Sequence, residues 1–264
     1  MIHETAIIDS TSIISNDVTI GANVKIGPYN VIEGDVVISD NCDIGSFNVI
    51  AEGTRLSKNV RIFHHNSIGT IPQDLKFHGE KTTFEVGENT IIREFCQLNR
   101  GTEYHNTTRI GKNCLIMGYV HLAHDCLVGN NVILVNSAQI AGHCEIEDHV
   151  IISGMTAAHQ FCRVGKHSMV QGGSKILKDV PPFISAQGTP LRFAGLNKIG
   201  LKRRGFTDET IQIISDAYRI VFREKLERSA AIDKLEREFK GVIEVNDIIE
   251  FLKKSDTRGY IGLG

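Results

Sequence analysis

The sequence contains no tryptophan, no excess of basic residues and no long apolar run. Its formal net charge of −2 does not fit a nucleic-acid-binding protein, because such proteins carry a basic patch. No apolar stretch reaches the length of a transmembrane helix. The first residues, Met1–Thr5, lack the basic region that opens a secretory signal. We therefore expect a cytoplasmic protein with no transmembrane segment and no nucleic-acid partner.

An aliphatic residue recurs at every sixth position along most of the chain. From Ile2 to Ile68 every step of this series is isoleucine or leucine, and the series resumes at Val86 and continues with gaps to Ile176. Neither a helix, with about 3.6 residues per turn, nor a simple alternating strand gives this spacing. A period of six predicts a parallel β-helix with three short strands in each coil of 18 residues. Successive coils should stack about 4.8 Å apart.

Glycine and cysteine follow the same period. Glycine, with 25 residues, often comes directly after the aliphatic residue, as at Gly27, Gly87 and Gly165, where a turn needs an unhindered backbone. The cysteines all lie four residues after an aliphatic position, at Cys42, Cys96, Cys114, Cys126, Cys144 and Cys162. This phase predicts small buried side chains and neither ligands nor nucleophiles. Cys126 and Cys144 could approach disulfide distance on stacked coils, but a cytosolic location argues against a bond.

The period is interrupted twice and then ends. The interruptions at Thr70–Glu85 and around Asn99–Arg109 predict external loops, which in a solenoid often lie at a binding face. After Asp179 the pattern becomes helical. We therefore predict a β-helix over Met1–Pro182 and a C-terminal α-helical domain over Phe183–Gly264.

Three helices are expected in the C-terminal domain. Thr207 is a suitable N-cap for a helix over Asp208–Glu224, which carries an apolar stripe. Ser229 is the expected cap of a second helix through Phe239. Asn246 is the expected cap of a third helix that ends at Lys254.

The coil length predicts two columns of polar residues outside the inward-facing positions. The first column contains His124, Gly142 and Gln160, and the second contains Asp125 and His143. A histidine on one coil beside a glycine N–H on the next suits acyl transfer. The imidazole removes a hydroxyl proton while the N–H stabilises the developing oxyanion.

Two further imidazoles, His121 and His159, lie close to these columns in the sequence. For any single residue of this group, an ordinary exposed polar side chain is the simpler interpretation, whereas the whole cluster favours function. Metal binding is the competing chemistry, because His121 and His124 with a third histidine have zinc-ligand spacing.

Several motifs together resemble one known family. They are Val120–Cys126, Ile140–His143, Gly154–Phe161 and Gly200–Phe206, with the insertion Pro72–Lys76 and the tripeptide Asn99–Gly101. The resemblance is to the acyl-carrier-protein-dependent UDP-N-acetylglucosamine O-acyltransferases and covers essentially the whole chain. It implies the left-handed form of the parallel β-helix, a hexapeptide-repeat solenoid. It also implies the transfer of an (R)-3-hydroxyacyl chain from acyl carrier protein to the sugar 3-hydroxyl, the first step of lipid A synthesis.

The resemblance assigns roles to the residues of the cluster. His124 would be the general base, Gly142 would hold the oxyanion and Asp125 would orient the imidazole. The sugar and the acyl acceptor site would be lined by Asp74, Lys76, His121, His143, His159 and Gln160. The nucleotide and its diphosphate would be held by Asn197, Arg203 and Arg204. Without the resemblance, a solvated basic patch is the favoured interpretation of Lys202–Arg204.

The family also implies an assembly and a chain-length determinant. Its members are homotrimers with active sites between neighbouring subunits, and they need no cofactor or metal. Gly172 matches the position that limits acyl length, where glycine leaves room for longer chains. Gly172 followed by Gly173 equally suits a tight turn. The sequence leaves open the preferred acyl length and the choice between a 3-hydroxyl and a 3-amino acceptor.

Three other functions fit the sequence less well. The related N-acyltransferase of the pathway has an additional N-terminal nucleotide-binding domain, whereas here the repeat begins at Ile2. A zinc-dependent γ-class carbonic anhydrase would explain the histidines but not Gly200–Phe206 or the insertion with Asp74 and Lys76. A noncatalytic β-helical scaffold would show regular outward threonine rows in place of histidines.

Overall fold

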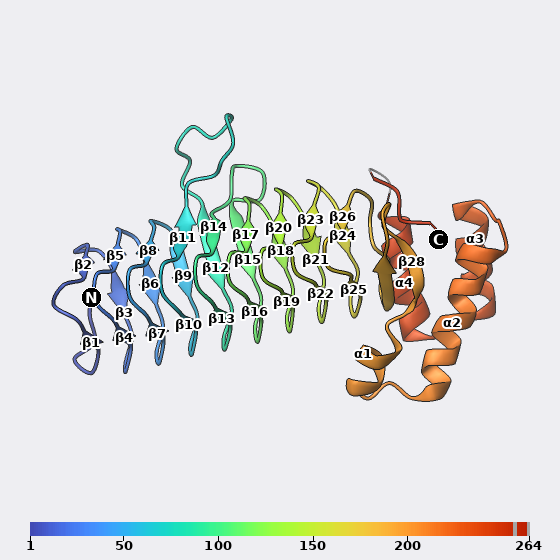
Figure 1. The fold of residues 1–264 in the computed structure, drawn as a ribbon, viewed down its shortest axis with the longest axis horizontal. Helices are drawn as coiled ribbons and strands as arrows, with labels where there is room; N and C mark the ends of the chain where they lie inside the picture. The colour runs from blue at the N-terminus through green and yellow to red at the C-terminus, as the bar shows by residue number, and fades with distance from the viewer. Residues whose placement is uncertain (256–257, 263–264) are drawn as a thin grey trace.

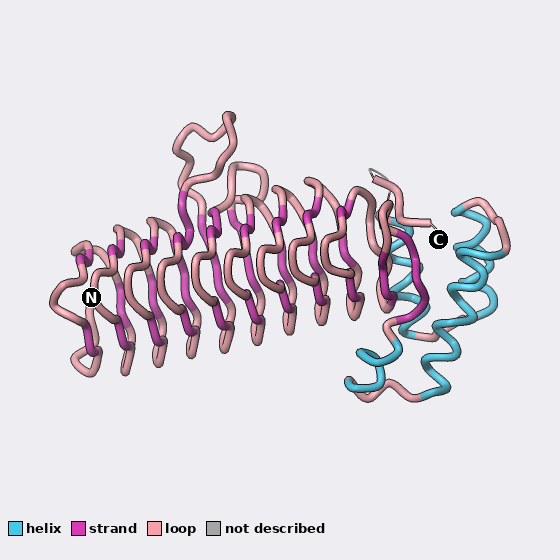
Figure 2. Tube along the Cα trace, in the orientation of Figure 1, coloured by secondary structure: helices cyan, strands magenta, loops and turns pink. Residues whose placement is uncertain are grey.

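The structure is a computed structural model that describes residues 1–255 and 258–262. Short parallel strands wind into a long prism, and four helices follow at its carboxyl end within the described residues (Figure 1). Strand and turn alternate along the prism with the regularity that the six-residue period predicts (Figure 2). The end of the predicted C-terminal domain, at residues 256–257 and 263–264, lies outside the described residues.

Three sheets form the faces of the prism, and each is named here after its first strand. The β1 sheet consists of β1 (Ile7–Ile8), β4 (Lys25–Ile26), β7 (Asp43–Ile44), β10 (Arg61–Ile62), β13 (Ile91–Ile92), β16 (Leu115–Ile116), β19 (Ile133–Leu134), β22 (Ile151–Ile152), β25 (Met169–Val170), β27 (Ile184–Gln187) and β28 (Arg192–Leu196). The β2 sheet consists of β2 (Ile13–Ile14), β5 (Val31–Ile32), β8 (Val49–Ile50), β11 (Ser67–Thr70), β14 (Gln97–Asn99), β17 (His121–Leu122), β20 (Gln139–Ile140), β23 (Ala157–Ala158) and β26 (Lys175–Ile176). The β3 sheet consists of β3 (Thr19–Ile20), β6 (Val37–Ile38), β9 (Thr54–Leu56), β12 (Thr83–Val86), β15 (Thr107–Ile110), β18 (Leu127–Val128), β21 (Glu145–Ile146) and β24 (Arg163–Val164).

The register of the strands confirms the coil length. Most paired residues are 18 positions apart, as in Ile133 with Ile151 on β19 and β22. The spacing rises to 30 where residues 71–82 leave the coil between β11 and β12, and to 24 where residues 100–106 leave between β14 and β15. Both segments project from the prism as loops (Figure 1). The two predicted interruptions are thus external loops.

The corners of the prism are named here after the two sheets that they join. Most corners contain a residue in the left-handed backbone region, such as Asn41 with φ 60° or Asn89 with φ 58°. The glycines after the aliphatic positions have a different reason to be glycine, because their coils approach closely. A Cβ at Gly87 would lie 2.5 Å from the carbonyl carbon of Gly111 on the next coil. The close contact between coils, more than the turn itself, therefore requires glycine there.

The interior of the prism consists of aliphatic ladders. Side chains such as Ile38, Ile68 and Ile116 are fully buried. All six cysteines are buried and free, which confirms their predicted packing role. Each coil buries its apolar side chains against its neighbours, so the fold is stable only as a stack.

The chain beyond Pro182 first continues the β1 sheet. Strand β27 pairs in parallel with β25, and β28 pairs antiparallel with β27. Four helices follow, α1 (Lys198–Arg203), α2 (Asp208–Arg223), α3 (Arg228–Glu238) and α4 (Ile243–Lys253). The buried hydroxyl of Tyr218 on α2 donates to the carbonyl oxygen of Pro182 at 2.6 Å and fastens the helices to the last coil.

One of the three predicted helix caps is correct. Thr207 caps α2 by accepting a hydrogen bond from the N–H of Thr210. The cap predictions for Ser229 and Asn246 are wrong, because α3 begins at Arg228 and α4 at Ile243, without side-chain caps. Burial of apolar side chains against the helical core decides these starts more than capping propensity does.

Within the described residues, no helix combines the length and the apolar character that a membrane span requires.

Candidate active site

The predicted columns form at the β2–β3 corner. The N–H of His143 donates to the carbonyl oxygen of His124 at 3.0 Å, and the N–H of Phe161 donates to that of Gly142 at 3.1 Å. A Cβ on Gly142 would lie 2.8 Å from Cε1 of the His124 ring. The predicted stacking of His124, Gly142 and Gln160 on consecutive coils is confirmed, and glycine is required beneath the imidazole.

His124 and Asp125 form a hydrogen-bonded pair although they are neighbours in sequence. The distance between Nδ1 of His124 and Oδ2 of Asp125 is 2.7 Å. Asp125 has the left-handed backbone of the corner residues, with φ 59°. The side chain of Asp125 is completely buried and that of His124 is 13% exposed. Asp125 lies outside the inward-facing positions, as expected, but it is shielded from solvent because the loop of residues 100–106 covers it.

That loop holds the carboxylate in place. Thr102 donates to Asp125 through its N–H, at 3.0 Å, and through its hydroxyl, at 2.6 Å. The N–H of His105 donates to the same carboxylate at 3.1 Å. The N–H of Asp125 in turn donates to the hydroxyl of Thr108 at 2.7 Å.

The hydrogen bonds keep Asp125 ionised. Burial alone would raise the pKa of this carboxyl group, but the donors from His124, Thr102 and His105 outweigh burial and lower it to about 2. The roles of Thr102 and His105 could not be predicted from the sequence, because both residues lie where the six-residue period is interrupted. The sequence does contain one indication of their role, because this interruption of the period lies one coil before the histidine motif.

His143 lies on the next coil in an aromatic surrounding. Its ring stacks on Phe161 with ring centroids 4.3 Å apart. It also lies nearly perpendicular to the ring of Tyr104, with centroids 4.6 Å apart. Its Nδ1 lies 3.9 Å from Oδ2 of Asp125. Burial lowers the pKa of His143, and the negative charges of Asp125 and Asp74 oppose this effect. His143 is therefore mainly neutral near pH 7.

Asp74 and Lys76 lie on the loop of residues 71–82. The negative charge of Asp74 acts on His143 and opposes the effect of burial on the pKa of His143. Asp74 also accepts a hydrogen bond from the N–H of Lys76 at 3.0 Å, which gives the loop a local turn. The side chain of Lys76 is exposed.

The other residues predicted for the acceptor site lie on or beside the β2 sheet. His121 is partly buried, with Nδ1 3.2 Å from the carbonyl oxygen of Gln97, and burial lowers its pKa. His159 and Gln160 are exposed. Gly172 is exposed at the β1–β2 corner, where an added Cβ would lie 3.1 Å from the carbonyl oxygen of Gly154.

Asn197 and Arg204 belong to a second cluster, at the β3–β1 corner. Asn197 caps α1 and donates to the carbonyl oxygen of His167 at 2.9 Å. Arg204 donates to the carbonyl oxygen of His149 at 3.0 Å, and its buried Nη1 has no hydrogen-bond partner within the described chain. Arg203 is exposed at the end of α1. One chain therefore places its predicted site residues at three different corners and does not bring them into a single cluster.

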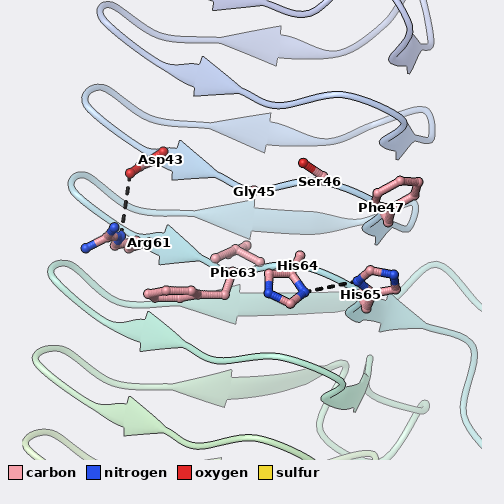
Figure 3. Close-up of a pocket in the computed structure, with 9 residues that line it drawn as sticks. Asp43, Gly45, Ser46, Phe47, Arg61, Phe63, His64 and His65 are labelled. Atoms are coloured by element: carbon pink, nitrogen blue, oxygen red, sulfur yellow. Dashed lines mark hydrogen bonds and ion pairs between the residues drawn. The ribbon is translucent and has the colours of Figure 1, made fainter.

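A separate surface hollow of about 330 Å³ lies beside β7 and β10, far along the prism toward the N-terminus (Figure 3). Arg61 lies 3.5 Å from Asp43 across the hollow, and Nδ1 of His64 lies 3.0 Å from Nδ1 of His65. The predicted site residues, all of which the structure describes, do not line this hollow. Ordinary ion pairing and ring packing account for this arrangement.

Family models match both parts of the chain. Residues 179–261 match the model described as UDP-N-acetylglucosamine O-acyltransferase, domain 2. Residues 17–52 and 107–142 match the bacterial transferase hexapeptide model.

Similar proteins of known name cover nearly the full length. An acyl-[acyl-carrier-protein]–UDP-N-acetylglucosamine O-acyltransferase of Chlorobium phaeobacteroides is 59% identical over 98% of this chain and 96% of its own length. A protein with the same name from Sulfurihydrogenibium is 58% identical over 93% of this chain and 91% of its own. The solved UDP-N-acetylglucosamine acyltransferase of Bacteroides fragilis has 44% identity and a TM-score of 0.93, covering 97% of this chain and all of that one. The coil is accordingly a left-handed parallel β-helix.

Proposed function

The chain belongs to the acyl-[acyl-carrier-protein]–UDP-N-acetylglucosamine O-acyltransferase family, and on that premise we propose that it transfers an (R)-3-hydroxyacyl chain from acyl carrier protein to the 3-hydroxyl of UDP-N-acetylglucosamine. This reaction is the first step of lipid A biosynthesis. The observation that carries the mechanism is the 2.7 Å contact between His124 and the buried, ionised Asp125.

His124 acts as the general base. Asp125 holds the proton of His124 on Nδ1, so that Nε2 is a free acceptor. Nε2 takes the proton of the sugar 3-hydroxyl as its oxygen attacks the thioester carbonyl carbon. When the tetrahedral intermediate collapses, the C–S bond breaks and the imidazolium returns the proton to the departing thiolate. Asp125 stabilises the imidazolium between these two steps.

The N–H of Gly142 serves as the oxyanion donor. At some equivalent turns on other corners this N–H is occupied, as where Ala22 donates to Asp40 on the next coil. Among the residues that the structure describes, no acceptor is paired with the N–H of Gly142. The next coil carries Gln160 at this place, with an exposed side chain. The N–H is therefore available to the developing negative charge.

The positions of the remaining residues support a homotrimer with sites between chains. Asp74, Lys76, His121, His143, His159 and Gln160 would line the acceptor site, Gly172 the acyl groove, and Asn197, Arg203 and Arg204 the nucleotide site. Because these groups lie at different corners of one prism, a second chain must supply part of each site. In a cyclic trimer of prisms, one corner of each chain faces a different corner of its neighbour, which creates three equivalent sites.

Three further features belong to the same proposal. The acyl carrier protein docks against basic residues near the helices, because carrier proteins are acidic. The protein acts in the cytoplasm. The chain divides into Met1–Pro182 and Phe183–Gly264, with β27 and β28 bridging the boundary as an extension of the β1 sheet.

An acyl-transfer assay tests the proposal. Purified, metal-depleted protein is incubated with UDP-N-acetylglucosamine and 3-hydroxyacyl carrier proteins of graded length, and the position of the ester is determined. Ester on the 3-oxygen is the expected product. Product only with the 3-amino sugar analogue would keep the mechanism and change the substrate, and no product with either sugar would contradict the proposal.

A further inference from the structure

The His124, Asp125 and His143 side chains offer a second chemistry at the same corner. One nitrogen or oxygen atom from each of the three lies within 4.8 Å of the others. We propose that these residues form a binding site for a divalent transition-metal ion of the Zn²⁺ type, and that the bound ion inhibits the enzyme. The binding is independent of the proposed function, whereas the inhibition rests on it.

The donor atoms are close to the spacing that zinc requires. Zinc bonds to imidazole nitrogen at about 2.0–2.1 Å and to carboxylate oxygen at about 2.0–2.2 Å, so neighbouring donors of a tetrahedral site lie roughly 3.3–3.5 Å apart. Oδ2 of Asp125 lies 2.7 Å from Nδ1 of His124 and 3.9 Å from Nδ1 of His143. To reach that spacing, the first pair must open by roughly 0.6–0.8 Å and the second must close by roughly 0.4–0.6 Å.

The state of His143 points to a missing partner. Its Nδ1 is buried and has no hydrogen-bond partner among the described residues. The ring cannot turn this nitrogen to solvent easily, because it stacks on Phe161 and contacts Tyr104. A buried polar atom without a partner is costly, and a metal ion beside Asp125 would satisfy it.

The surroundings of Asp125 already have the form of an outer ligand shell. Metal-bound carboxylates are usually oriented by hydrogen-bond donors behind them. Here the N–H and hydroxyl of Thr102 and the N–H of His105 supply those donors. The carboxylate is therefore already fixed and ionised when an ion arrives.

Metal binding and catalysis use the same nitrogen of His124 in different ways. An ion on Nδ1 takes the place of the proton that Asp125 otherwise accepts, and that proton moves to Nε2, so Nε2 can no longer accept the proton of the sugar hydroxyl. The ionisable groups that face His143 are Asp125, His124, His105 and Asp74.

Cobalt absorption and calorimetry test the binding without an activity assay. The metal-depleted full-length protein is titrated with Co²⁺, whose visible absorption reports the coordination, and with Zn²⁺ by calorimetry. We expect one ion per chain at this site, and at least a tenfold loss of affinity in His143→Phe, which keeps a ring against Phe161. Circular dichroism melting is the check that this variant is folded.

His64→Gln is the matched control. His64 lies 3.0 Å from His65 and 3.7 Å from Glu94, so it offers a similar set of donors on the exposed face near β10. This variant should bind the ion at the corner like the wild type. The buried thiols do not compete well, because burial raises the pKa of Cys42 and Cys96 to about 11.

The outcomes separate the two proposals. Binding that is equal in wild type and His143→Phe, or that is lost in His64→Gln, would overturn the metal site. A turnover that Zn²⁺ leaves unchanged at saturation would overturn the inhibition. If the metal-free protein shows no acyl transfer while Co²⁺ binds as expected, the proposed function fails and the metal site stands.

Discussion

The carboxylate of Asp125 receives donors from residues that belong to different parts of the chain. His124 precedes it directly, whereas Thr102 and His105 come from a loop one coil earlier. Because burial and hydrogen bonding act in opposite directions on Asp125, the number of donors decides its charge. The behaviour of this single residue therefore depends on a loop that contributes nothing to the interior of the prism.

Replacing His124 by alanine should lower the turnover number at least about 100-fold, because a general base contributes on that scale. The affinity for UDP-N-acetylglucosamine should change little, since the loss is confined to the transition state. Steady-state kinetics and calorimetry measure the two effects separately. An unchanged turnover number would remove His124 from the mechanism.

Thr102→Val should lower the turnover number about tenfold or more, because a hydrogen bond to a charged group contributes roughly 1.5–3 kcal/mol. The substitution keeps the size and the N–H donor but removes the hydroxyl that donates to Asp125. Thr102→Ser, which restores the hydroxyl, should recover most of the activity. If both variants lose activity equally, Thr102 serves the fold of the loop and does not position Asp125.

Gly172→Met should shift the acyl preference toward shorter chains. Gly172 is exposed at the β1–β2 corner, and a long side chain there would occupy the proposed acyl groove. Competition assays with carrier proteins of graded acyl length measure the preference. The same order of preference in both proteins would rule out Gly172 as the determinant of length.

Among the elements, the junction between the last coils and α1 contains a pair of stacked imidazoles. The rings of His149 and His167 lie 4.6 Å apart, and His167 also stacks on Phe183 at 5.6 Å. Burial lowers the pKa of His167 to about 4, and the nearby charges of Arg204 and Lys166 add to the effect. The junction is therefore built around a neutral histidine.

This junction should weaken in mild acid. His167 titrates near pH 6.5 when unfolded and near pH 4 when folded, so the unfolded state binds more protons between these values and stability falls as the pH falls. Between about pH 7 and pH 5 the loss attributable to His167 should be roughly 2 kcal/mol.

His167→Phe isolates this contribution, because it keeps a ring in the stack and removes the titration. Urea unfolding at the two pH values should show a smaller acid loss in the variant than in the wild type. Asp125 does not interfere, because its stabilising effect is lost only as the pH falls below about 4 toward its folded pKa of about 2. An equal loss in both proteins would place the acid sensitivity elsewhere.

At the scale of the elements, contacts that repeat from coil to coil could be predicted from the sequence, whereas loop contacts and helix starts could not. The six-residue period predicted the coil, the buried cysteines and the stacking of His124 on Gly142, because each depends on a repeated contact between coils. The donors from Thr102 could not be predicted, since the loop that carries them has no period. The start of α4 was missed because the burial of Val245 and Ile248 outweighs the local preference of Asn246 for a cap.

For the whole molecule, the decisive test concerns the position of the site between chains. His124→Ala and Arg204→Ala should each be nearly inactive alone. When the two are co-expressed or refolded together, about a quarter of the sites in randomly mixed trimers should combine an intact His124 with an intact Arg204. Activity near that fraction supports sites shared between chains, and no recovery would mean that each chain forms its own site.

The coil of 18 residues also makes the length of the molecule discrete. An added coil moves everything that follows by about 4.8 Å along the axis and leaves every inward side chain in phase. The extra residues at 71–82 and 100–106 project from the prism as loops and do not add to its length. The separation of His124 from the helical end can therefore change only by whole coils. Finer adjustment of a distance along the axis must come from the size of side chains, and at Gly172 no side chain is present.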